Sequence, residues 1–240
     1  GKARLEITGK VQLDLIYDFK RVNPDWAATL RPSQIPVTCP GDAGCGKDGE
    51  TIFSVRQTTL GVKGYMPTSA GELKTDLSAD LFGTGGGSTQ LHLIHAWAEL
   101  GQFGVGQYES LFMNLDTFPN TIDYWGPSGM VFLRNPQVRY TPINRDGMTV
   151  AFSLEAPNSA IDTGKLSVSD AASGIQGRTK YPDIVGKLSL QRDWGAFQAA
   201  GILRSVGYET TTTASGNPSG TLTGWGINLS ASVKTVGQDR

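Results

Sequence analysis

Residues 5–19 alternate between apolar and polar side chains, and this pattern restricts the fold more than any other feature. The odd positions are apolar or Gly, namely Leu5, Ile7, Gly9, Val11, Leu13, Leu15, Tyr17 and Phe19. A period of two residues predicts a β-strand with one apolar and one polar face. An ordinary strand holds only about 5–6 residues. The two alternatives are a membrane-crossing strand with aromatic residues at its interface and a long, half-buried strand of a soluble sandwich.

The composition excludes several other classes. Among the 240 residues, 31 are Gly and no run of about 18 apolar residues occurs, so we expect no transmembrane helix. The formal charge of −1 gives no electrostatic reason for binding nucleic acid, and we expect no such partner.

Nine further segments are predicted as strands, which gives ten. They are residues 51–66, 73–81, 89–100, 103–113, 136–144, 148–155, 184–191, 197–204 and 225–234. Long loops alternate along the chain with tight turns, such as those at Gly101–Gln102 and Asp146–Gly147. A soluble sandwich has no reason to sort its loops in this way. The polar faces also carry more charges than a packed core accepts, whereas a water-filled lumen accepts them. The pattern therefore predicts an all-β protein, a transmembrane antiparallel β-barrel.

Several stretches resemble one family, the DcaP-like porins. They are residues 106–116, 119–129 and 134–141, with His95-Ala-Trp-Ala-Glu99 and residues 192–198. The resemblance implies a homotrimeric channel in the outer membrane of Gram-negative bacteria, in contact with lipid, that takes up small anionic solutes such as dicarboxylates. It also implies a barrel of about 16 strands, an even number as in other bacterial barrels. We therefore expect residues 1–240 to form one porin domain that is part of a longer chain.

The segment 114–135 does not alternate, contains Pro and Gly, and is the third of the long loops. In general porins the third external loop folds into the barrel and narrows it. By this analogy, Asp116, Asp123 and Arg134 would line a constriction. The alternative is an external loop that packs at the trimer surface.

Strand parity gives a second set of candidate pore residues. Basic residues on the polar faces are Lys10, Lys74, Arg139, Lys187, Arg204 and Lys234, and acidic ones are Asp14, Asp76, Asp80 and Glu155. Cations from separate strands would guide anions through a pore, and the forked donors of Arg suit carboxylates. The candidate pore and substrate residues are therefore Arg134, Arg139, Lys74, Lys187, Arg204, Arg56, Asp116 and Asp123. The alternative is an ion-paired lumen with little selectivity.

Cysteines and histidines complete the candidate sites. Cys39 and Cys45 lie in a short Gly/Pro loop, which predicts a disulfide in an oxidising compartment. His92 and His95 fall on opposite faces by parity, so we expect no metal site, and no cofactor is indicated.

The sequence shows no cluster of a nucleophile, a base and an acid that would indicate an enzyme. The barrel pattern, together with the resemblance to the porins, implies passive, diffusive uptake of small hydrophilic solutes. The alternatives are a general non-selective porin, a barrel enzyme and a secreted β-sandwich binding protein.

Overall fold

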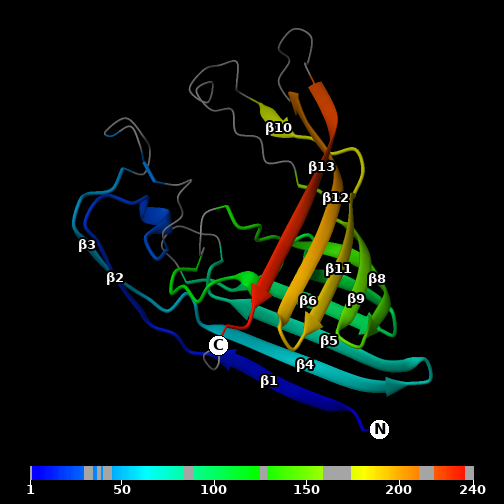
Figure 1. The fold of residues 1–240 in the computed structure, drawn as a ribbon. Helices are drawn as coiled ribbons and strands as arrows, with labels where there is room; N and C mark the ends of the chain where they lie inside the picture. Colours follow the sequence, from blue (N-terminus) through cyan, green and yellow to red (C-terminus); the bar gives the residue numbers. More distant parts are fainter. Residues whose placement is uncertain are drawn as a thin grey trace. The chain divides into compact units, whose positions relative to one another are not determined.

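The computed structural model describes residues 2–29, 35–36, 39, 45–83, 89–124, 129–158, 174–210 and 219–235. The chain divides into two compact units, which we describe separately (Figure 1). Unit 1 consists of Gly1–Gly101 and Phe118–Phe132, and unit 2 consists of Gln102–Thr117 and Leu133–Arg240. Within the described residues, no helix has the length and apolar character needed to cross a membrane.

Unit 1 contains an antiparallel sheet and a separate hairpin. The sheet is formed in order by β1 (Arg4–Lys10), β4 (Thr59–Thr68), β5 (Gly71–Asp80) and β6 (His92–Leu100). The hairpin is formed by β2 (Asp14–Asp18) and β3 (Glu50–Ser54), and the short 3-10 helix η1 (Pro24–Trp26) follows β2. The prediction of one uninterrupted strand over residues 5–19 is therefore wrong, as is the single strand over 51–66.

The two predicted strands, 5–19 and 51–66, break where backbone groups of the first form hydrogen bonds with a side chain of the second. The Gln12 amide donates to the hydroxyl oxygen of Thr58 over 3.1 Å, and that hydroxyl donates to the Gln12 carbonyl over 3.3 Å. These two bonds replace the regular ladder between the strands. The alternation nevertheless continues across the break, since Ile7 and Leu15 are 81% and 67% exposed. The odd residues thus lie on one face that no second sheet covers among the described residues.

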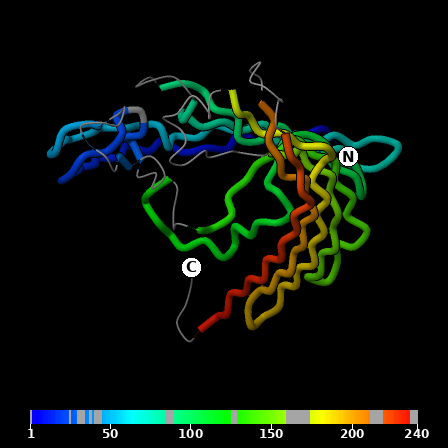
Figure 2. The backbone as a smooth tube through the Cα atoms, turned by 90° about the horizontal axis from the view of Figure 1, so that it is seen from above, coloured from blue at the N-terminus to red at the C-terminus, as the bar shows by residue number. Residues whose placement is uncertain are grey.

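Unit 2 contains seven strands among its described residues. An antiparallel sheet runs in order through β7 (Phe103–Glu109), β8 (Arg134–Arg145), β9 (Met148–Glu155), β11 (Asp183–Arg192) and β12 (Gly195–Thr210). β13 (Ser219–Val233) pairs with β12 along nearly its whole length, and the short β10 (Ile175–Gly177) pairs with the last residues of β12. Figure 2 shows β12 and β13 running together.

The two faces of the unit 2 sheet have opposite character. One face, here called the outer face, carries exposed apolar side chains such as Val138, Phe152 and Trp225, which is 74% exposed. The other, here called the inner face, carries buried polar side chains such as Gln137 and Gln198. This arrangement is the reverse of a soluble sandwich, and it is typical of a sheet whose outer face meets lipid.

The connections confirm the predicted alternation of long loops and tight turns. Asp146 and Gly147 have φ of 52° and 65°, as a type I′ hairpin turn requires. Only Ser69 and Ala70 connect β4 to β5, so the connection after β5 belongs to the long set. The described residues form thirteen strands rather than ten, because two predicted strands are broken and β10 is additional. Among these strands, β1 pairs only with β4 and β13 only with β12, so the barrel is not closed.

Candidate pore-lining site

Residues 110–117 fold back from the end of β7 onto the inner face of unit 2. This segment contains the 3-10 helix η3 (Leu115–Thr117) and the start of the predicted constriction loop. The Gln198 amide donates to the Met113 carbonyl over 2.9 Å, and the Asn228 amide donates to the Phe112 carbonyl over 2.8 Å. We call Gln198 and Asn228 the amide clamp. The clamp lies on the neighbouring strands β12 and β13, so it ties the segment to both.

Two further contacts hold the same segment. The carboxylate of Glu155, which is 1% exposed, accepts hydrogen bonds from the Leu111 amide over 3.0 Å and from the Ser153 hydroxyl over 2.7 Å. The Asn114 amide donates to the Ser230 hydroxyl over 2.8 Å. The otherwise unpaired backbone groups of the loop are therefore satisfied by side chains of the sheet, as burial requires.

Apolar packing supports these hydrogen bonds. Leu111 forms a buried cluster with Ala151 and Val185, and Phe112 and Ile202 pack against it. The apolar side chains of the sheet interrupt an otherwise polar inner face. Small residues on the strands allow the loop segment to come close to the sheet. A Cβ at Gly226 would lie 3.2 Å from the Ile202 side chain and 3.3 Å from the Phe112 ring, so any larger residue would crowd both.

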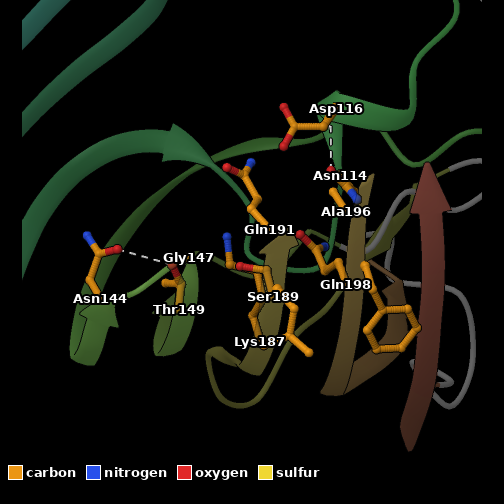
Figure 3. A pocket seen from close by; sticks show the side chains of 12 residues that line it. Asn114, Asp116, Asn144, Gly147, Thr149, Lys187, Ser189, Gln191, Ala196 and Gln198 are labelled. Atoms are coloured by element: carbon orange, nitrogen blue, oxygen red, sulfur yellow. Dashed lines mark hydrogen bonds between the residues drawn. The ribbon is translucent and has the colours of Figure 1, made fainter. Parts of the chain in front are cut away.

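A cavity of about 210 Å³ lies between this segment and the sheet (Figure 3). Asn114 and Asp116 border it from the loop, and Lys187, Ser189 and Gln198 border it from β11 and β12. The remaining lining residues are Asn144, Gly147, Thr149, Leu190, Gln191, Ala196 and Phe197. The lining is mostly amide and hydroxyl groups, with one basic and one acidic side chain.

The basic residues predicted on the polar faces of β8, β11 and β12 all lie on the inner face of unit 2. Arg204 pairs with Asp183 over 3.1 Å, and Asp183 is fully buried. Arg139 donates to the Glu109 carbonyl over 2.7 Å and to the Gln137 side chain over 3.0 Å. Lys187 differs from both, because within the described residues its ammonium makes no hydrogen bond and no ion pair.

Arg134, the remaining basic candidate of unit 2, is the first residue of β8. Its side chain is half-buried.

The other three predicted residues belong to unit 1 and have separate partners. Asp123 accepts a hydrogen bond from the Thr29 hydroxyl over 2.8 Å. Lys74 lies 3.9 Å from Glu99 at an exposed position. Arg56 lies in the break between β3 and β4, where its guanidinium stands 4.7 Å from the centre of the Phe82 ring. These three side chains therefore serve local contacts within unit 1.

Asp80 is a structural centre of unit 1 whose role the sequence did not reveal. It is 2% exposed and accepts hydrogen bonds from the Tyr124 hydroxyl and the Phe82 amide, each over 2.9 Å. The Tyr124 ring also packs on Phe82, with centroids 3.9 Å apart. The middle of the predicted constriction loop is thereby attached to the end of β5.

The expectation that His92 and His95 lie on opposite faces is wrong. The register between β5 and β6 shifts at Ser78/Ala79, which is the mark of a β-bulge. The extra residue brings His92 to within 2.9 Å of Asp80 and His95 to within 2.9 Å of Ser78. Within the described residues, no group of three or more His, Cys, Asp or Glu side chains could hold a metal.

The cysteines predicted to pair are joined in the structure. The Cys39–Cys45 disulfide closes a short loop, and the Cα atoms of the two residues are 5.9 Å apart. Since the sequence contains only these two cysteines, no free thiol remains.

Comparisons with known proteins agree with this architecture. The family model of the DcaP outer membrane protein matches residues 1–239. The crystal structure of the outer membrane channel DcaP of Acinetobacter baumannii is similar, with a TM-score of 0.75 and 20% sequence identity. The match covers 97% of this chain and 60% of that channel, so this chain spans less than two thirds of its length. A search of curated proteins found no match. The chain therefore belongs to the DcaP outer membrane protein family, a family of outer membrane proteins of Gram-negative bacteria rather than of enzymes.

Proposed function

We propose that the full-length protein is a channel for passive diffusion of small hydrophilic solutes, with a preference for organic anions such as dicarboxylates. The observation that carries this proposal is the inner face of unit 2, where Arg139, Lys187 and Arg204 come from three different strands. Fixed positive charges on a pore wall attract anions and repel cations. The buried Asp183 compensates Arg204, so Arg139 and Lys187 supply most of the effect.

The location of the loop supports a narrowed pore. Because residues 110–117 are held on the inner face, we propose that the segment 114–135 restricts the lumen. The exposed apolar side chains of β1 and β2 would then meet lipid or a neighbouring copy in a homotrimer. Residues 1–240 would form part of one barrel domain.

The experiment is a reversal-potential measurement on the full-length channel in a planar bilayer under a potassium chloride gradient. We expect anion preference, and replacing both Arg139 and Lys187 with Gln should reduce it. Higher salt should weaken the effect, since the Debye length is about 8 Å at physiological ionic strength. Cation preference in the unmodified channel would refute the anion assignment and leave a general porin.

The matched control is Arg145→Gln. Arg145 is exposed at the tight turn after β8 and pairs with Met148 across the hairpin. It lies on the outer face, because its neighbour Asn144 borders the cavity. Removal of this charge should leave the reversal potential unchanged.

A further inference from the structure

The cavity of unit 2 has one positive and one negative side chain in a mostly neutral lining. Lys187 stands on β11 and Asp116 stands on η3, on the loop side of the cavity (Figure 3). The other polar groups, such as Ser189, Thr149 and Gln198, are hydroxyls and amides. A small molecule held here would therefore meet a cation, a carboxylate and several neutral hydrogen-bonding groups.

Lys187 is the group best placed to bind a carboxylate. The cations Arg204 and Arg139 are already bonded to protein atoms, whereas the ammonium of Lys187 has no such partner within the described residues. An ammonium carries three donors and no acceptor. A solute carboxylate would satisfy these donors in a half-buried site, where a charge-assisted hydrogen bond is about twice as strong as a neutral one.

Asp116 determines which chemical group the other end of the solute must carry. Its backbone amide is bonded to the Asn114 side chain over 3.1 Å, and its exposed side chain borders the cavity. An ionised carboxylate only accepts hydrogen bonds, and it repels a second carboxylate nearby. A hydroxyl or an ammonium at the far end of the solute would instead donate to Asp116.

We propose that this cavity binds small solutes with one carboxylate, held by Lys187, and a hydrogen-bond donor, held by Asp116. These are hydroxy acids and amino acids, and the site holds them more tightly than dicarboxylates of equal length. The inference rests on the proposed function, because solutes reach the cavity only if the full-length protein is a channel. The preference of this cavity is narrower than that of the pore as a whole, which admits dicarboxylates as well. The cavity of about 210 Å³ equals about seven times the volume of a water in the liquid, which suits a molecule of a few carbons.

The test uses the full-length channel in planar bilayers and three probes of equal chain length. These are succinate, γ-hydroxybutyrate and γ-aminobutyrate, and the measurement is the concentration of each that blocks half of the chloride current. We expect succinate to need the highest concentration. Asp116→Asn should lower the value for succinate about three- to tenfold, as expected for one unit charge in a wet site. It should raise the value for γ-aminobutyrate, and Lys187→Gln should raise all three values.

Two controls separate the site from a general change of charge. Asp146→Asn and Arg145→Gln remove the same charges from the exposed turn between β8 and β9, outside the cavity lining. Asn also suits the positive φ of 52° at position 146. Neither control should change the ratio between the probes.

An unchanged ratio of succinate to γ-aminobutyrate in Asp116→Asn would overturn the inference. Unchanged values for all three probes in Lys187→Gln would overturn it as well. A different result would refute the proposed function, namely a reversal potential that shows cation preference in the unmodified channel, measured without any probe.

Discussion

Removal of the amide clamp should release the segment 110–117 from the inner face. In the double variant Gln198→Ala and Asn228→Ala, the carbonyls of Met113 and Phe112 lose donors at 2.9 and 2.8 Å. A buried carbonyl left without a partner costs about 1–3 kcal/mol. The low ends of the two costs sum to about 2 kcal/mol, and we take this sum as the working value for the two adjacent carbonyls. Since each 1.4 kcal/mol is a factor of ten, the open population should rise about 30-fold.

A single introduced thiol can measure this opening. Met113 is 4% exposed, and the native cysteines are joined in a disulfide, so Met113→Cys would provide the only free thiol of this chain. The labelling rate of this thiol by a water-soluble reagent follows the population of the open state when closing is fast. We therefore expect labelling to be about 30 times faster in the double variant than in Met113→Cys alone.

The control for the clamp is Ser232→Ala. Ser232 pairs with Ala196 on the same face of β13, two residues beyond Ser230. Its replacement should leave the labelling rate unchanged. Equal labelling rates in the double variant and its parent, with a folded channel in both cases, would refute the assignment of the clamp.

Three further predictions concern the loop and the disulfide. Gly226→Val should crowd Phe112, and because overpacking costs about 1–3 kcal/mol, labelling of the same thiol should rise at least about fivefold. Tyr124→Phe should remove one hydrogen bond to the Asp80 carboxylate, worth about 1.5–3 kcal/mol, so hydrogen exchange in residues 118–124 should accelerate at least about tenfold while β5 stays protected. Alkylation without reductant should add no mass to the two cysteines, and uptake of two alkyl groups under these conditions would contradict the disulfide.

The local pattern of the sequence was enough to predict the strands, the turns and the polar or apolar character of each face. A period of two is fixed by the geometry of a strand, and the alternation over residues 148–155 therefore predicted β9 with both ends correct. The turn at Asp146 and Gly147 was also readable, because only a few residues accept positive φ. The inner position of Arg139, Lys187 and Arg204 followed from the same parity.

Register and long-range contacts could not be read in this way. The break in residues 5–19 depends on the contact of Gln12 with Thr58, and the position of both histidines on one face depends on a bulge opposite Ser78. One residue of shift moves a side chain to the opposite face, and no local pattern encodes it.

The same limit applies to the site. The basic residues of the inner face were visible in the sequence as charges on one side of a strand, whereas Asp183 lay outside the predicted strand. The structure decided that Asp183 neutralises Arg204, that Lys187 borders a cavity, and that Asn228 holds a carbonyl 116 residues away in the chain. Parity fixes the face on which a side chain lies, whereas its partner depends on the pairing of distant strands and on the path of a loop. The sequence by itself therefore determined the polar and apolar faces of the sheet, and only the tertiary structure decided which charges of the polar face are paired with protein atoms among the described residues.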